Sequence, residues 1–250
     1  MTYSIVARDP ASGQVGIAVA SRFFAVGCMV PSISYGIGAV CSQAFVNPHY
    51  SAKALALLQN DEQPSDVIKR LTDEDEGRLQ RQLHMLDYHG RSAAYTGVNC
   101  IEWAGHEIAD NVSVAGNMLS GPAVVADTLT TYQSTSGLPL PERLLMAMQA
   151  GEDAGGDKRG KQSAALLVYK DQTYPWIDIR TDDHADPLEE LRRLYDVAQE
   201  RYLIMLDMLP SRDNPHGLID RREIDQKLQS LELDRLSKGI KTRSFATPLS

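Results

Sequence analysis

Residues 1–22 are MTYSIVARDPASGQVGIAVASR, and this stretch decides the fold. Two β-prone runs, TYSIVA at 2–7 and VGIAVAS at 15–21, flank the turn-forming segment DPASGQ at 9–14. Because Asp, Pro, Ser and Gly favour turns while the flanking runs favour extended backbone, the pattern predicts a β-hairpin at the start of the chain.

Strand-like and helical patterns alternate after this hairpin. The apolar stretch at 30–44 contains Gly36 and Gly38, which lack a Cβ and let neighbouring backbones approach closely. Helices are expected at residues 50–59, 65–75, 123–133 and 141–154. Further strands are expected at residues 81–97, as a second hairpin, and at 112–117, 163–170 and 174–180. This order predicts an α+β fold, a four-layer αββα sandwich of two antiparallel sheets with helices outside.

The C-terminal part of the chain has a different pattern. Residues 187–209 carry apolar side chains near helical spacing, and a charged helical tail follows. The sequence therefore predicts a main domain over residues 1–190 and a helical C-terminal extension over 191–250, which we expect to pack on the domain or on a partner subunit.

Composition excludes several functional classes. The chain has 250 residues, 43% of them hydrophobic and 23% charged, as in an ordinary globular protein. Its net charge of -8 disfavours nucleic acid as a partner. We find neither a signal peptide nor a run of the roughly 20 apolar residues that crosses a bilayer. The three cysteines, an odd number, predict reduced thiols. We therefore expect a cytoplasmic protein that does not bind membranes.

Thr2 is the candidate nucleophile. It follows the initiator Met1, and a small side chain at this position allows aminopeptidases to remove that methionine. The exposed α-amine, with an unperturbed pKa of about 7.7 to 8.0, would then accept the hydroxyl proton at neutral pH. A threonine at position two also arises by chance, so the context has to support this role.

Six ordered blocks supply that context. They are MTYSIVARDP, GIAVASRFFAVG, GAVCSQAFVNPHY, WAGHEIA, GNMLSG and GGDKRGKQSAALLV, and they span about residues 1 to 190. Through them the chain resembles the DUF1028 family of unknown function, and its opening resembles that of N-terminal-nucleophile (Ntn) hydrolases. This resemblance implies that Thr2 begins the first strand as nucleophile and that Ser21 and Arg22, at the end of the second strand, orient it.

Three amide side chains are further candidates. Asn117, in the glycine-flanked segment AGNMLSG, could stabilise an oxyanion through its amide or through neighbouring backbone N–H groups, or could simply be structural in a turn. Gln43 and Asn47 could line a substrate cleft near the start of the first strand. Helix capping explains Asn47 equally well.

The loop GGDKRGKQSA at 155–164 is the richest polar cluster. Asp157 could orient a cation, while Arg159 and Gln162 could bind a substrate carboxylate, although a charged connecting loop is an equal alternative. The loop lacks the Ser or Thr and the following helix of a phosphate-binding P-loop. The six histidines lack metal-ligand spacing, so neither a metal nor another cofactor is predicted.

These observations favour hydrolysis of an amide bond by a homo-oligomeric enzyme, in a small polar substrate for which a carboxylate is one candidate group. Two alternatives remain. A noncatalytic Ntn-like module would bind a small molecule or a protein, because a shared fold does not establish a shared reaction. An internal nucleophile such as Ser4 or Ser21 would tolerate a retained Met1, but the sequence does not identify a base for it.

Overall fold

The computed structural model describes residues 2–246. The predicted first hairpin is confirmed: β1 (Thr2–Arg8) pairs antiparallel with β2 (Val15–Ser21). The other strands are β3 (Pro31–Ser34), β4 (Gly38–Ala44), β5 (Arg81–Asp87), β6 (Ser92–Thr96), β7 (Gly105–Ala109), β8 (Val112–Asn117), β9 (Ser163–Tyr169) and β10 (Ile177–Thr181). The helices are α1 (His49–Leu58), α2 (Pro64–Asp73), α3 (Ala123–Ser134), α4 (Leu140–Asp153), α5 (Pro187–Val197), α6 (Leu203–Leu206) and α7 (Arg221–Ser237).

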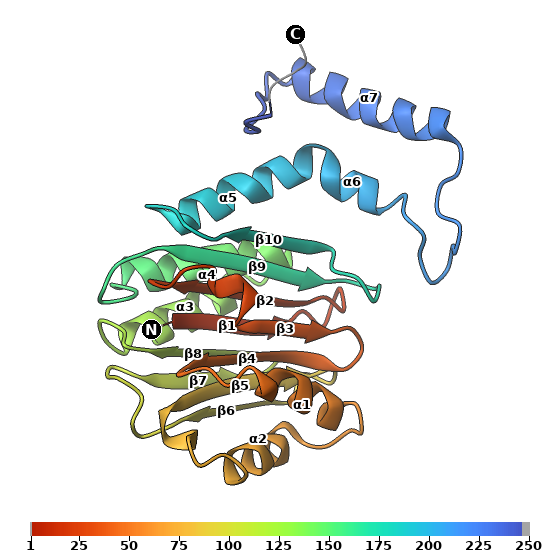
Figure 1. Ribbon diagram of the computed structural model, residues 1–250. Helices are drawn as coiled ribbons and strands as arrows, with labels where there is room; N and C mark the ends of the chain where they lie inside the picture. The colour runs from red at the N-terminus through yellow and green to blue at the C-terminus, as the bar shows by residue number, and fades with distance from the viewer. Residues whose placement is uncertain (1, 247–250) are drawn as a thin grey trace. The chain divides into compact units, whose positions relative to one another are not determined.

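Two antiparallel sheets form the body of the fold, as predicted (Figure 1). One has six strands in the order β10-β9-β2-β1-β8-β7, and the other has four in the order β3-β4-β5-β6. β1 therefore lies inside the larger sheet, between β2 and β8. The edge strand β7 is absent from the sequence prediction, because its exposed His106 and Glu107 break the apolar pattern that marks a buried strand.

Helices pack against both sheets. α3 and α4 contact β8, β2 and β1 of the six-stranded sheet, whereas α1 and α2 contact β4, β5 and β6 of the four-stranded sheet. The two sheets contact each other through β1 with β4 and through β5 with β8. Both faces of β1 are therefore covered, which explains why its residues from Thr2 to Ala7 are all buried.

The interior between the sheets has an apolar part and a polar part. Alternate residues of β1, β2, β4 and β5 build the apolar part, among them Val6, Ile17, Cys41 and Leu86. Side chains on the same faces build the polar part, which is described with the site below. The hydrophobic residues of α1 and α2 pack in a separate cluster on the outer face of the four-stranded sheet.

The two glycines of the second apolar stretch have different roles. A Cβ on Gly38 would lie 2.5 Å from the carbonyl oxygen of Leu86, so the predicted close approach of backbones is confirmed there. A Cβ on Gly36 would meet no atom within 4 Å. Gly36 instead adopts a φ of +76° in the turn between β3 and β4, a conformation that disfavours other residues.

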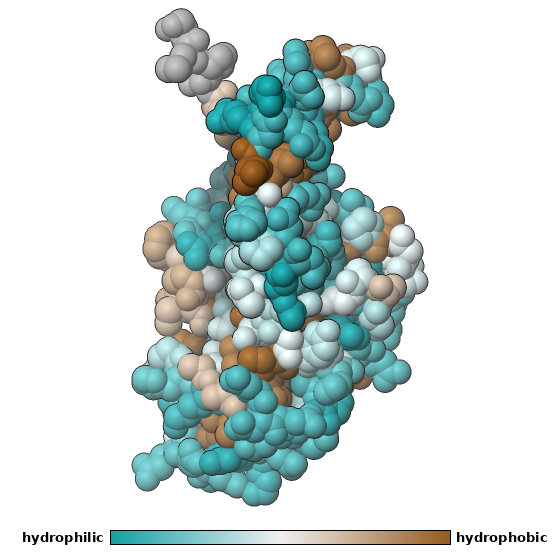
Figure 2. Space-filling view, turned by 90° about the vertical axis from the view of Figure 1, so that its right-hand side faces the viewer, coloured by the Kyte–Doolittle hydropathy of each residue, from teal (hydrophilic) through white to brown (hydrophobic). Residues whose placement is uncertain are grey.

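The described chain divides into two compact units between Leu188 and Glu189, inside α5. The helix expected over 187–209 is formed by α5, a π-helical turn at Ala198–Tyr202 and α6. Figure 2 shows a mostly hydrophilic face with separate small hydrophobic patches. Within residues 2–246, no helix combines the length and the apolar character that a membrane span requires.

Candidate functional site

Thr2 lies where β1 begins, beside the ends of its two neighbouring strands. It is paired with Asn117 of β8, and the next residue, Tyr3, is paired with Ala20 of β2. The Thr2 hydroxyl donates a hydrogen bond to Ser21 Oγ at 3.3 Å. The structure thus brings Thr2, Ser21 and Asn117 together. β1 begins at the point in the sheet where its two antiparallel neighbours, β2 and β8, end.

Asn117 contacts the backbone of Thr2. Its Nδ2 donates to the Thr2 carbonyl oxygen at 3.3 Å and to Gln82 Oε1 at 2.9 Å. An amide nitrogen carries two hydrogens, so both donors of Asn117 are engaged. Donating to an oxyanion would require Asn117 to release one of these partners. The oxyanion role of Asn117 stays a prediction, and neighbouring backbone N–H groups remain the alternative.

The charged loop meets the end of β2. The backbone N–H of Arg22 donates to Asp157 Oδ2 at 2.8 Å, and Arg22 Nη1 donates to Gln162 Oε1 at 2.8 Å. Arg159 Nη2 lies 3.2 Å from Asp157 Oδ2, with 40% of the Arg159 side chain exposed. The backbone N–H of Gln162 also donates to the carbonyl oxygen of Ser21 at 3.1 Å. Four of the predicted residues therefore form one cluster next to Thr2.

Asp157 is the centre of that cluster. Its carboxylate is 3% exposed and accepts from the backbone of Arg22 and Arg159 as well as from the Arg159 guanidinium. A buried carboxylate with charged and backbone donors holds its partners in fixed positions. Asp157 thereby anchors the Arg159 guanidinium, whereas the Arg22 guanidinium is held by Gln162 Oε1. Both groups lie near the end of β2 that carries Ser21, the hydrogen-bond partner of Thr2.

Gln43 and Asn47 have other surroundings. Gln43 is 1% exposed, and its amide accepts from Ser4 while donating to Gln82 and to the Ala115 carbonyl. Asn47 Nδ2 donates to Asp75 Oδ2 at 3.2 Å, and its Oδ1 accepts from the backbone N–H of His49 in the first turn of α1. Substrate contact by either residue stays a prediction, and the hydrogen bonds of Asn47 fit the capping alternative.

Sequence reasoning missed a buried polar group between the sheets. Ser4 Oγ lies 2.8 Å from His84 Nε2, and His84 Nδ1 lies 3.1 Å from Ser113 Oγ. Ser4 and His84 are each 0% exposed. The signal was present in the sequence as polar residues at alternate positions, such as Gln82 and His84, which place both side chains on one face of a strand.

His84 answers one question that the sequence left open. Its Nε2 lies 2.8 Å from the Oγ of Ser4, the internal residue considered as an alternative nucleophile. The single hydroxyl hydrogen of Ser4 is donated to Gln43 Oε1, so His84 Nε2 donates to Ser4 and does not accept its proton in this arrangement. Complete burial, followed by the charge of His106, lowers the pKa of His84 to about 3. The imidazole is therefore neutral at pH 7. Because Ser4 has no exposed surface, a substrate could reach it only if the two sheets separated.

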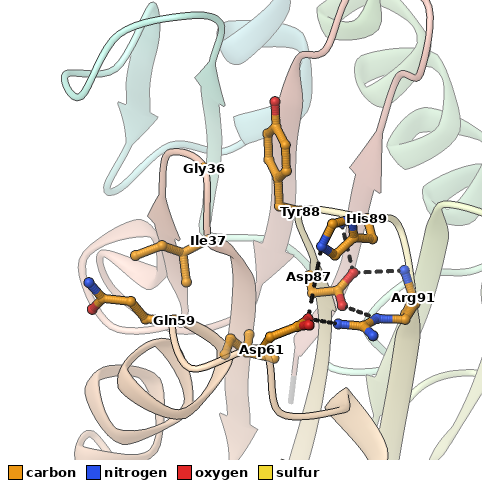
Figure 3. A pocket seen from close by; sticks show the side chains of 9 residues that line it. Gly36, Ile37, Gln59, Asp61, Asp87, Tyr88, His89 and Arg91 are labelled. Atoms are coloured by element: carbon orange, nitrogen blue, oxygen red, sulfur yellow. Dashed lines mark hydrogen bonds and ion pairs between the residues drawn. The ribbon is translucent and has the colours of Figure 1, made fainter.

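A cavity of about 340 Å³ lies away from Thr2, at the Gly38–Asp87 end of the β4–β5 pair (Figure 3). The turns before β4 and after β5 line it together with the end of α1. Arg91 bridges Asp61 and Asp87, and Asp87 also accepts from the backbone N–H of His89. These charged groups satisfy one another, so the cluster ties the turn after β5 to the loop after α1.

Across residues 2–246, no three His, Cys, Asp or Glu side chains are grouped so that they could hold a metal ion.

Comparisons with known proteins were made on both sequence and structure. The model of a family of unknown function, DUF1028, matches residues 2–191. The crystal structure of a DUF1028 protein from Silicibacter pomeroyi matches with a TM-score of 0.82 and 30% identity, covering 88% of this chain and 96% of that chain.

Anbu, an ancestral β-subunit from Yersinia bercovieri, matches with a TM-score of only 0.39 and 12% identity, covering 84% of this chain and 98% of that chain. So low a score does not establish a common fold. A search of curated proteins found no match. The family model matches residues 2–191, which is most of the chain, and the S. pomeroyi structure, itself a DUF1028 protein, covers 88% of the chain. This chain belongs to the DUF1028 family.

Proposed function

We propose that this protein is an N-terminal-nucleophile amidohydrolase with Thr2 as its nucleophile. One observation carries the proposal: Thr2 is the first residue of an interior strand, its hydroxyl is bonded to Ser21 and its carbonyl is bonded to Asn117. A nucleophile needs a fixed direction of attack, and contacts on both its side chain and its backbone supply one.

The reaction begins once Met1, which lies outside the described residues, has been removed. The Thr2 α-amine accepts the hydroxyl proton while Oγ1 attacks the amide carbon. Backbone N–H groups, or Asn117 after it releases a partner, hold the oxyanion. The C–N bond breaks as the departing amine takes up the proton, and water then hydrolyses the ester and restores the Thr2 hydroxyl.

A carboxylate on a small polar substrate is the proposed recognition element. The Arg159 guanidinium is held by Asp157 and that of Arg22 by Gln162, close to the end of β2, and the Arg159 side chain is 40% exposed. Guanidinium groups bind carboxylates with two parallel hydrogen bonds when their orientation is fixed. N-acyl amino acids combine an amide bond with such a carboxylate, so they are the first compounds to screen.

Thr2→Ala is the first variant to test. Intact mass should show that the purified protein lacks Met1, and steady-state assays with N-acyl amino acids should then show turnover. The Thr2→Ala variant is expected to lose at least about 1,000-fold in kcat because the nucleophile is gone. Thr2→Ser, which keeps the hydroxyl, should retain measurable turnover.

Two controls accompany these variants, and the first of them tests the α-amine separately from the hydroxyl. A short N-terminal extension that blocks the amine but keeps the Thr2 side chain should also be inactive. Thr130→Ala, on the exposed face of α3, should leave turnover unchanged. Full turnover by a folded Thr2→Ala protein, or by a protein that keeps Met1, would contradict the mechanism. Ligand binding without turnover would favour a noncatalytic binding module.

A further inference from the structure

A band of buried polar side chains crosses the space between the two sheets and ends at Thr2. Its members are Ser4, Gln43, Gln82, His84, Ser113 and Asn117, each at most 3% exposed. Burying polar groups costs free energy unless they are hydrogen-bonded, and an apolar core would avoid that cost. Hydrogen bonds link every member of the band, from Ser113 through His84, Ser4, Gln43 and Gln82 to Asn117.

Gln82 has an orientation that its surroundings determine. Its Nε2 donates to the carbonyl oxygens of Gly116 at 2.8 Å and of Gly105 at 3.1 Å. A carbonyl oxygen only accepts, so the nitrogen of the Gln82 amide must face these two groups. The amide oxygen therefore faces the other way, where it accepts from Asn117 Nδ2 at 2.9 Å and Gln43 Nε2 at 2.8 Å.

The orientation of Gln82 determines that of Asn117. Because Gln82 offers an acceptor, Asn117 must present its nitrogen, and the same nitrogen reaches the Thr2 carbonyl oxygen at 3.3 Å. A flipped Asn117 amide would place oxygen against oxygen at both contacts. Asn117 is thus held so that it donates to the backbone of Thr2.

We propose that Gln82 is a positioning residue of the Thr2 site and acts through Asn117. The proposal rests on the function proposed above. Once Met1 has been removed, Thr2 is the chain terminus, and terminal residues are poorly ordered unless they are tied down. The bond from Asn117 ties the Thr2 carbonyl, and Gln82 keeps the donor of that bond in place. Gln82 is itself fully buried, so it touches no substrate.

The test replaces Gln82 with methionine, which has a similar length but lacks the amide. We expect Gln82→Met to lower kcat by about 10- to 100-fold, the cost of misplacing a reacting group, with KM changed less than about twofold. Thr96→Val is the matched control, because it removes a different partner of the same Gln82 amide, Thr96 Oγ1 at 2.9 Å. This control should lower thermal stability but keep kcat.

A second measurement needs no folded variant. In the unmutated protein, the side-chain NH2 hydrogens of Asn117 should exchange with solvent at least about 100-fold more slowly than those of the exposed Asn99, as NMR can measure. Fast exchange of these hydrogens would show that Asn117 is not held in place, and would overturn the positioning role of Gln82 even if Thr2 is the nucleophile.

The two proposals can fail separately. An unchanged kcat in Gln82→Met, together with an inactive Thr2→Ala, would overturn the positioning role while leaving Thr2 as nucleophile. Full activity of Thr2→Ala would instead overturn the proposed function. The positioning role of Gln82 would then be overturned as well, because Thr2 would no longer be a catalytic residue to position. A kcat loss of equal size in Thr96→Val would show that Gln82 acts only through stability, and would also overturn the positioning role.

Discussion

His84 lies between Ser113 and Ser4 in the polar band and is neutral there. Its two ring nitrogens contact Ser4 and Ser113, and burial lowers its pKa to about 3. In the unfolded chain the same side chain has a pKa of about 6.5. Between these two values the unfolded state binds one more proton than the native state, so stability falls as the pH falls.

We predict that His84→Gln weakens this pH dependence. Between pH 6 and pH 5, unfolding by urea should show that the original protein loses about 1 kcal/mol more than the variant, because each pH unit below 6.5 contributes up to about 1.4 kcal/mol per proton. The variant can be less stable overall, since the measured quantity is the slope.

Thr130→Ala is the control for that slope, because Thr130 lies on the exposed face of α3 and has no titratable side chain. This variant should keep the slope of the original protein between pH 6 and pH 5. Equal slopes for His84→Gln and the original protein would contradict a neutral, buried His84.

At the scale of elements, the pairing of β4 with β5 depends on a glycine, which has no side chain. Gly38 is paired with Asp87, and a Cβ on Gly38 would lie 2.5 Å from the carbonyl oxygen of Leu86. A backbone carbonyl in a sheet cannot rotate away as a side chain can. The sheet would have to shift to admit even a methyl group.

We therefore predict that Gly38→Ala lowers the free energy of unfolding by about 1–3 kcal/mol, the usual cost of forcing an extra carbon into a packed site. Gly137→Ala is the control, because a Cβ there meets no atom within 4 Å. It should change the stability by less than about 0.5 kcal/mol. Chemical denaturation of both variants measures the difference, and equal stabilities would refute the close approach.

At the scale of the whole molecule, two segments of irregular backbone each contain an arginine after which trypsin can cut. The loop at 155–162 is bound to β2 through Asp157 and Gln162. The segment at 207–220, between α6 and α7, contains Arg212 in irregular backbone. Proteases cut where the backbone opens locally, so the two segments should differ in their sensitivity.

Limited digestion with trypsin should cut after Arg212 before it cuts after Arg159, as mass spectrometry of the fragments would show. In Asp157→Asn, which removes the charge that pairs with Arg159, cutting after Arg159 should become faster while the rate at Arg212 stays the same. Arg212→Gln should abolish the early cut. Early cleavage after Arg159 in the original protein would mean that Asp157 does not hold the loop.

Local sequence patterns determined the first hairpin and the fold class of this protein. Turn residues between two apolar runs were sufficient to predict the β1–β2 hairpin, and the order of patterns predicted an α+β fold with two antiparallel sheets. Turn and strand patterns depend on neighbours in the chain, and composition and periodicity record them directly. Thr2 was named from its place after Met1, whereas Ser21 and Arg22 were named as its orienting residues only through the resemblance to Ntn hydrolases.

Only the tertiary structure decided which buried polar groups meet. Gln82 and Asn117 are 35 positions apart, and Ser4 and His84 are 80 apart. The register of β1 with β8, and the packing of one sheet on the other, bring these side chains into contact. No local pattern specifies that packing, because it depends on how whole faces of the sheets fit together. The sequence therefore determined the strand that carries Thr2, and the packing of the two sheets decided what holds it.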